Sequence, residues 1–173
     1  MKINYVFNKA TEQQIKDHLW RMDRDFMPPL HTYVDIDQYS QKLAANAVRI
    51  ESYMGSKLVG LIATYYNRDK MFLYVSNISI EKDFRGKGIE LSRGLVNFLA
   101  GDQDLAGYSP KTRKIANDWL KELTNDAKPA KLIIKSIHTE VRNANRKALL
   151  FYRRLGFNEV KTEMQSTYLI KEL

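Results

Sequence analysis

The chain has 173 residues, no cysteine and a formal net charge of +8. Its length predicts one domain, residues 1–173, which buries roughly 70% of the surface that the unfolded chain exposes. The lack of cysteine excludes a disulfide scaffold, a cysteine nucleophile and thiolate metal sites, and the three histidines lack metal-ligand spacing, so we expect no metal site. No apolar run approaches the roughly 18–20 residues that span a bilayer, and we expect a cytoplasmic protein with no membrane partner.

The first half of the chain predicts a strand, two helices and three further strands. Residues 2–7 alternate as a strand, and Thr11 begins a helix with a capping box that continues to the prolines at 28–29. Asp37 is the expected N-cap of a second helix. Three strand patterns then follow, at residues 47–53, 57–67 and 71–80.

The second half predicts helices and strands in alternation. A helical pattern runs from Leu91 to a stop at Gly101, and Ser109-Pro110 favours an additional amphipathic helix, which we interpret as core packing. The remaining elements are a strand, a helix and two final strands, at 131–141, 145–155 and within 159–173. The predicted class is α/β: a central mixed, mostly antiparallel sheet flanked by helices, with the extra helix near 110–125.

The most informative stretch is residues 78–91, where a β-branched strand leads into a basic turn and then into a helical pattern. The first backbone N–H groups of a helix have no intrahelical partner and carry partial positive charge, which suits an anion. Gly86 and Gly88 lack a Cβ and let a phosphate approach the backbone, while Arg85 and Lys87 supply formal charge. The stretch therefore predicts a pyrophosphate site, with an ordinary surface turn as the alternative.

The turn is neither a P-loop nor a dinucleotide-binding fingerprint, because Leu91 stands where the third glycine would be. Its spacing resembles instead the R/Q-x-x-G-x-G/A signature of the GCN5-related N-acetyltransferase (GNAT) superfamily. Arg85, Gly88 and Ile89 match that signature, whereas Glu90 departs from it because the family has Gly or Ala there.

A second stretch, beginning at Asn145, resembles the other hallmark of that superfamily, N-x-x-A-x-x-x-Y-x-x-x-G-F. Asn145, Ala148 and Tyr152 occupy its defined positions, and the stretch follows the glycine turn, as it does in the family. The alternative is a plain amphipathic helix in which Tyr152 only packs. The resemblance covers roughly residues 58–160 and implies a GNAT-like fold.

The resemblance also implies an N-acetyltransferase that uses acetyl-CoA as its acetyl donor. In the superfamily, the pantetheine arm pairs with the strand before the turn, and the tyrosine protonates the departing thiolate or stabilises it by hydrogen bonding. Tyr152 is therefore the implied catalytic residue. The implied cofactor-binding residues are Ile78, Ser79, Ile80, Arg85, Gly86, Lys87, Gly88, Ile89, Glu90, Asn145 and Ala148.

The general base is left open. Many members of the superfamily place a glutamate on the strand before the turn, but the corresponding segment, 71–80, contains no acid. Glu81 comes after this strand and is expected to point to solvent. Glu140 and His138, on the following predicted strand, are candidates, and a water molecule is a third.

The acceptor site is expected between the first two helices, their linker and the C-terminal strands. In the linker, Asp35 or Asp37 suits a cationic amine, and His31 and Tyr33 suit a sugar or peptide; alternatively, the linker prolines only end a helix. We expect a small-molecule amine acceptor, such as an amino sugar or polyamine, with a protein amine as the alternative and a homodimer left open.

Two other classes of protein remain as alternatives. A non-catalytic acyl-CoA-binding module would keep the fold and bind the cofactor without turnover. A nucleic-acid-binding protein would grip backbone phosphates with the basic turn. The basic residues are spread along the chain without a long Lys/Arg block, so we do not expect a nucleic-acid partner.

Overall fold

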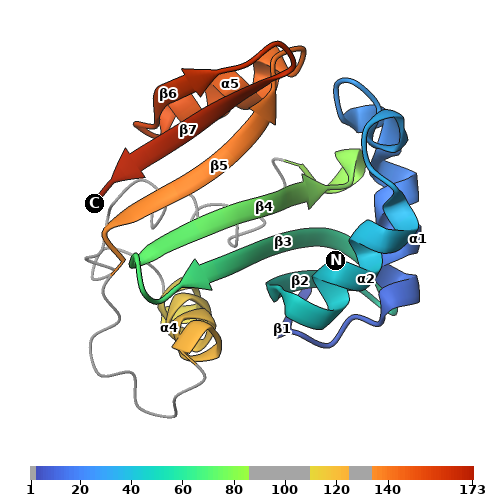
Figure 1. Cartoon of the computed structure of the whole chain (residues 1–173). Coiled ribbons are helices and arrows are strands. Elements are labelled where there is room, and N and C mark those ends of the chain that lie inside the picture. Colours follow the sequence, from blue (N-terminus) through green and yellow to red (C-terminus); the bar gives the residue numbers. More distant parts are fainter. Residues whose placement is uncertain (1–2, 86–109, 125–133) are drawn as a thin grey trace.

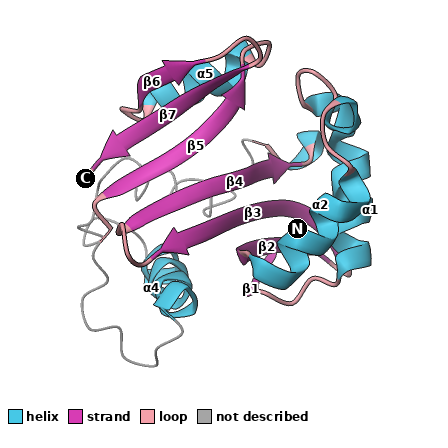
Figure 2. Cartoon of the chain, viewed as in Figure 1, coloured by secondary structure: helices cyan, strands magenta, loops and turns pink. Residues whose placement is uncertain are grey.

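The structure is a computed structural model that describes residues 3–85, 110–124 and 134–173 (Figure 1). A seven-stranded mixed sheet forms its centre, in the order β1-β2-β3-β4-β5-β7-β6, and helices cover the sheet (Figure 2). The strands are β1 (Asn4–Phe7), β2 (Val48–Met54), β3 (Lys57–Asn67), β4 (Phe72–Ile80), β5 (Ser136–Arg142), β6 (Asn158–Thr162) and β7 (Ser166–Glu172). The described α-helices are α1 (Glu12–Met22), α2 (Ile36–Asn46), α4 (Pro110–Thr124) and α5 (Arg146–Arg154). Short 3-10 turns are η1 (Asp23–Asp25), η2 (Leu30–Thr32) and η3 (Lys82–Phe84).

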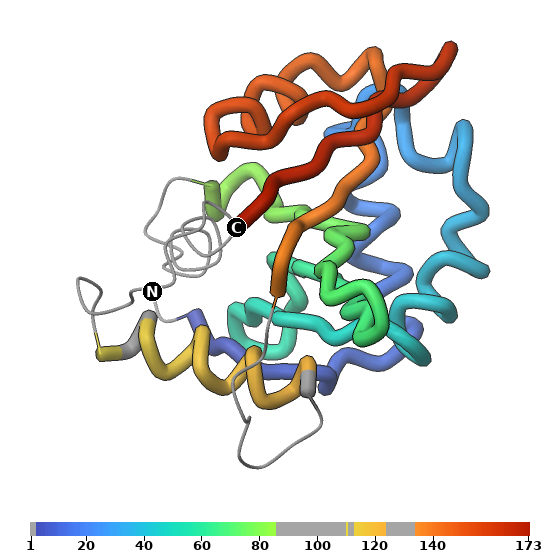
Figure 3. Tube along the Cα trace, turned by 60° about the vertical axis from the view of Figure 1, so that its left-hand side comes forward, coloured from blue at the N-terminus to red at the C-terminus, as the bar shows by residue number. Residues whose placement is uncertain are grey.

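The predicted α/β class is confirmed, because β4 and β5 run parallel while all other neighbouring strands run antiparallel. The predicted helix from residue 91 and the start of the strand predicted at 131 lie outside the described residues. Both views place β5, α5, β6 and β7 together on one side of the molecule, away from α4 (Figures 1 and 3).

The two N-terminal helices begin at side-chain caps. In α1, Thr11 Oγ1 accepts from the Gln14 backbone N–H at 3.2 Å and Gln14 Oε1 accepts from that of Thr11 at 3.0 Å, which confirms the predicted capping box. The prediction of Asp37 as the cap of α2 is wrong. Asp35 has the extended backbone that a cap requires, and its Oδ1 accepts from the N–H groups of Asp37 and Gln38.

Helix α1 also ends earlier than expected. It stops at Met22 and continues only as the 3-10 turn η1, so the prolines at 28–29 lie in the linker beyond it. The predicted helix near 110–125 is confirmed as α4.

The core has two parts, one on each face of the sheet. On the α1–α2 face, Ile15, Leu19 and Leu43 meet apolar residues of β3. On the other face, the buried side chains include Trp119 and Leu123 of α4, Tyr152 of α5, and Leu73, Val75, Ile137, Phe157 and Leu169. The expectation that α4 is a core-packing helix is therefore confirmed.

A buried ion pair on β2 joins both N-terminal helices to the sheet. Arg49 Nε donates to Glu51 Oε1 at 3.0 Å, and the two residues are 3% and 0% exposed. Arg49 Nη1 also donates to the carbonyls of Leu43 and Ala44 at the end of α2. Glu51 Oε2 accepts from the backbone N–H of Ala10, just before α1. These extra hydrogen bonds offset the desolvation of both charges and fix the helix ends on β2.

A second buried polar contact holds α1 against the end of β4. His18 is fully buried, with Nε2 2.9 Å from Ser79 Oγ and Nδ1 3.3 Å from the Leu58 carbonyl oxygen. The Ser79 hydroxyl lies 2.8 Å from Asn77 Oδ1. Burial, assisted by the nearby Arg21 guanidinium, lowers the pKa of His18 to about 4. The imidazole is therefore neutral at pH 7.

This depressed pKa makes stability depend on pH. Below about pH 6.5, His18 is protonated in the unfolded chain but stays neutral in the folded protein, so added protons favour unfolding. The free energy of unfolding therefore decreases as the pH is lowered from 6.5, until the pH reaches the folded pKa near 4. Between pH 6.5 and 5 the wild type should lose about 2 kcal/mol more than a His18→Asn variant. Urea unfolding across this range measures both slopes, and parallel slopes would contradict the prediction.

Candidate active site

The two parallel strands of the sheet separate after a short paired region. Residues Phe72–Val75 of β4 pair with Ser136–Thr139 of β5, and beyond them the two strands diverge (Figure 1). Beyond this region, residues 77–80 of β4 pair with β3 on one side. Within the described residues, no strand pairs with its other side. An open strand edge offers N–H and C=O groups to any extended ligand that carries amides.

A β-bulge accompanies the separation. Asn77 pairs with Ala63 and Val75 pairs with Thr64, so Ser76 is an extra residue on β4. Such an insertion bends a strand and increases its twist, which directs β4 away from β5.

Side chains from two other elements hold the bulged backbone. The Tyr39 hydroxyl, from α2, donates to the Ser76 carbonyl oxygen at 3.0 Å. Thr139 Oγ1, from β5, donates to the Val75 carbonyl oxygen at 3.0 Å. Two consecutive carbonyls of β4 are thus held by side chains of α2 and β5 at the point where the strands part.

The three predicted strand residues of the cofactor site lie at the open end of β4. Ile78 and Ile80 are half-buried and pack against the core on the α4 face. Ser79 is buried on the opposite face, where it contacts His18 of α1. This end of β4 is therefore supported on both faces while its outer edge lacks a strand partner in the described part of the chain.

Arg85 is the described residue of the predicted phosphate-binding turn; Gly86, Lys87, Gly88, Ile89 and Glu90 lie outside the described residues. The Arg85 guanidinium donates from Nε to the Ile80 carbonyl oxygen at 2.8 Å and from Nη2 to Asp25 Oδ2 at 2.7 Å. It therefore connects the end of β4 with η1.

The expectation that Glu81 points to solvent is wrong. Its side chain is 13% exposed and accepts from Arg21 Nε at 2.7 Å and from Lys57 Nζ at 2.6 Å. Burial raises the pKa of Glu81, but hydrogen bonds from Lys57 and Arg21 outweigh it and leave the pKa below its ordinary value. The cations come from α1 and β3, so the chain around Glu81 gives no sign of them.

Tyr152 lies on α5, beside the point where the strands separate. Its side chain is 7% exposed and makes edge-to-face contacts with Phe151 and Phe157, at ring-centroid distances of 5.2 and 5.1 Å. Burial raises the pKa of Tyr152 to about 12, against the effect of a hydrogen bond with Thr139. The phenol is therefore protonated at neutral pH, next to the same Thr139 that holds the Val75 carbonyl.

The other two residues of the second motif lie in the first turn of α5. Asn145 is the N-cap of this helix, and its Oδ1 accepts from the Ala148 backbone N–H at 3.1 Å. The motif spacing thus produces a capped helix that positions Tyr152 two turns later.

The two candidate bases lie at different places on β5. His138 is within the paired region; its ring stacks on Phe72 at 4.2 Å, and Nε2 lies 2.9 Å from Ser136 Oγ. Burial lowers the pKa of His138. Glu140 lies beyond the paired region and is exposed, so it borders the opening between the strands.

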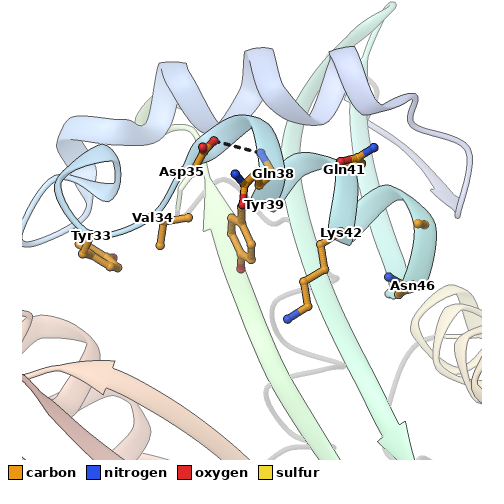
Figure 4. Close-up of a pocket in the computed structure, with 9 residues that line it drawn as sticks. Tyr33, Val34, Asp35, Gln38, Tyr39, Gln41, Lys42 and Asn46 are labelled. Atoms are coloured by element: carbon orange, nitrogen blue, oxygen red, sulfur yellow. Dashed lines mark hydrogen bonds between the residues drawn. The ribbon is translucent and has the colours of Figure 1, made fainter.

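An open pocket of about 720 Å³ lies along α2 and the linker before it (Figure 4). Its lining includes Tyr33, Asp35, Gln38, Tyr39 and Lys42. Because the Tyr39 hydroxyl contacts Ser76, the pocket adjoins the bulge of β4.

The pocket contains only some of the linker residues that were expected to bind the acceptor. Tyr33 and Asp35 line it. His31 lies elsewhere, with Nδ1 2.8 Å from Asp23 Oδ2, and the Asp37 carboxylate pairs with Lys16 at 2.7 Å.

Sequence reasoning missed three residues of this region. Tyr39 shares a face of α2 with Leu43, which indicates packing and gives no sign of the contact with Ser76, and Lys42 follows no motif. His18 shares the buried face of α1 with Ile15 and Leu19, and this placement on an apolar face was the one available signal that its imidazole is buried.

The described residues contain neither a candidate membrane-spanning helix nor a candidate metal site. Within residues 3–85, 110–124 and 134–173, no helix is both long and apolar enough to cross a membrane. Over the same residues, no three His, Asp or Glu side chains are grouped so that they could hold a metal ion.

No protein-family model matches the chain, and no curated protein matches it in sequence. Solved structures do match. A GNAT-family acetyltransferase from Staphylococcus aureus is 12% identical, with a TM-score of 0.59 and 99% of each chain covered. A chimera of the spermidine N-acetyltransferase SpeG from Vibrio cholerae and hSSAT is 15% identical, with a TM-score of 0.57 and coverage of 99% of this chain and 96% of that one.

A third match is the PaiA N-acetyltransferase from Thermoplasma acidophilum, whose structure is a complex with coenzyme A. It is 11% identical, with a TM-score of 0.55 and 100% of each chain covered. At these identities the likeness concerns the fold alone, and it confirms the fold expected from the two motifs. The chain has the fold of the GNAT-family acetyltransferases.

Proposed function

We propose that the chain is an N-acyltransferase that moves an acetyl group from acetyl-CoA to a primary amine, and that residues 1–173 form one such domain. The observation that carries this proposal is the edge of β4 over residues 76–80, which no described strand covers, beside a bulge that is fixed by Tyr39 and Thr139. The GNAT fold supports the same conclusion.

The pantetheine arm of acetyl-CoA carries two amides, and in this proposal it lies against the open edge of β4 in the manner of an added strand. The cofactor-binding roles of Ile78, Ser79 and Ile80 are then mainly backbone roles. Their side chains pack on both faces and keep the strand rigid. Because this backbone is already ordered in the free protein, little conformational entropy is lost when the ligand binds. Arg85, together with the turn at 86–90, is the proposed pyrophosphate site.

In the transfer step, the neutral amine nitrogen attacks the thioester carbonyl carbon, the C–S bond breaks, and sulfur leaves as a thiolate. An ordinary amine arrives protonated, and we assign its first proton to Glu140, directly or through water, which leaves the neutral nitrogen that attacks. The nitrogen loses a second proton to solvent after the attack. The thiolate gains one proton, so the products are the amide and free coenzyme A. Exchange with solvent then returns Glu140 to its carboxylate form.

Tyr152 is proposed to act on the leaving sulfur. A phenol of pKa about 12 is a weaker acid than a thiol of pKa about 8.5, so complete proton transfer to the thiolate is uphill by about 5 kcal/mol. Tyr152 therefore acts as a hydrogen-bond donor that stabilises the developing negative charge on sulfur, and solvent completes the protonation.

Removing this hydroxyl tests the assignment. Tyr152→Phe should lower kcat about 100-fold with little change in the KM for acetyl-CoA. The matched control is Tyr53→Phe, because the Tyr53 hydroxyl lies on β2 near Gln14, far from the separation of β4 and β5. Release of free thiol reports the rate. Full activity of Tyr152→Phe would refute this role, and acetyl-CoA binding by the wild type without any turnover would favour the non-catalytic module.

The proton acceptor has a separate test. Glu140→Gln should lower kcat at least about 10-fold with an ordinary amine, because the attacking nitrogen then lacks its base. The loss should shrink with hydroxylamine, which is already neutral at the assay pH. The control is Glu159→Gln, since Glu159 pairs with Arg153 on the surface. An equal loss with both acceptors would instead indicate a structural role for Glu140.

A further inference from the structure

We infer that the acceptor is an amine that also carries an anionic group, a carboxylate or a phosphate, and that Lys42 binds this group. The inference rests on the proposed function and names the substrate class of the same site. It is carried by the charges around the pocket along α2.

The pocket is placed to deliver an acceptor to the thioester. It lies on the side of α2 where Tyr39 reaches the bulge of β4, and Figure 4 shows Tyr33, Tyr39 and Lys42 projecting from the same side of the linker and α2. Tyr39 therefore links the pocket directly to the bulge at which β4 and β5 part. Glu140 lies on β5, the other strand that borders this opening.

Lys42 is an available cation. Among the described residues that line the pocket, it is the one basic side chain. It is exposed, its Nζ lies 6.0 Å from the centre of the Tyr65 ring, and it forms no ion pair within the described part of the chain. An ammonium group with aromatic surface beneath it and no carboxylate partner suits an anionic ligand group.

A second cation lies beside the same pocket. The Arg142 guanidinium stacks over the Tyr33 ring at 4.3 Å, and its Nη1 donates to Gln165 Oε1 and Ser166 Oγ. These contacts hold the positive charge in place next to a residue that lines the pocket.

The nearby carboxylates do not offset these charges. Asp35 Oδ1 accepts two backbone N–H groups at the start of α2, so the helix end already balances it. Asp37 pairs with Lys16, and Asp23 contacts His31. Of the carboxylates considered in the described part of the chain, Glu140 remains to receive the amine. A polyamine would place its further ammonium groups near Lys42 and Arg142, so we do not expect the spermidine-type acceptor named for one of the structural neighbours.

Apart from Lys42 and the capping carboxylate of Asp35, the described lining is uncharged. Gln38, Gln41 and Asn46 supply amide donors and acceptors, and the rings of Tyr33 and Tyr39 supply flat apolar surface. The pocket therefore presents a cation and neutral hydrogen-bonding groups, and Glu140 lies on β5 across the opening from it, which together complement an amine with an anionic substituent.

Matched acceptor pairs test the inference. Acetyl transfer is measured with glycine and glycinamide, and with glucosamine 6-phosphate and glucosamine, so that each pair differs by the anionic group and the two pairs separate carboxylate from phosphate. The wild type should prefer the anionic member of at least one pair by roughly 30-fold in kcat/KM. Lys42→Glu should abolish that preference and improve the diamine putrescine as an acceptor.

The control variant is Lys70→Glu, which makes the same charge change in the turn between β3 and β4 and should keep the wild-type preference. Thermal stabilisation by acetyl-CoA checks each variant, because Lys42→Glu should bind the cofactor as the wild type does.

The outcomes separate this inference from the proposed function. If acetyl-CoA stabilises the protein and hydroxylamine is acetylated, but neither anionic acceptor exceeds its neutral partner, the inference is overturned and the proposed function stands. The inference is likewise overturned if Lys42→Glu leaves the preference unchanged. If acetyl-CoA does not bind, or if no acceptor is acetylated, the inference and the proposed function are both contradicted.

Discussion

The separation of β4 from β5 is the constraint on which the candidate site depends. A parallel pair of strands normally continues for the length of the shorter strand, since each residue that pairs adds hydrogen bonds. Here the pairing stops at Val75 and Thr139, where Ser76 adds a residue to β4 and bends it. The backbone groups released by this bend provide the proposed cofactor edge, and the elements around the opening provide Tyr152, Glu140 and the pocket.

Keeping such an edge open requires support from elsewhere in the fold. Tyr39 and Thr139 fix the two carbonyls at the bulge, and His18 supports the strand from beneath. The helices that carry Tyr39 and His18 are in turn fixed to β2 by the buried pair of Arg49 and Glu51. A chain of polar contacts thus runs from β2, through α1 and α2, to the end of β4.

The sequence predicted the elements whose signals are local. The capping box at Thr11, the amphipathic pattern of α4 and the two GNAT-like motifs all depend on residues within a few turns of one another, and the structure confirms the fold that they imply. The cap of α2 was misassigned by two residues because Asp35 and Asp37 are equally good capping residues, and the backbone conformation decides between them.

The site residues that the sequence missed depend on contacts between distant segments. Glu81 is held by cations that are 60 and 24 residues away, and His18 meets Ser79 across 61 residues. The bulge at Ser76 is a property of the register with β3 and has no residue signature of its own. Pocket residues such as Lys42 follow from the packing of α2 over the opening, which periodicity alone does not give.

Hydrogen exchange along β4 tests the central claim most directly. With saturating acetyl-CoA, the backbone amides of residues 76–80 that point away from β3 should exchange more slowly, while those of β2 should change little, because the pantetheine arm pairs with the open edge. ATP at the same concentration is the control and should not protect these residues. Unchanged exchange over 76–80 in protein that binds acetyl-CoA would contradict the account.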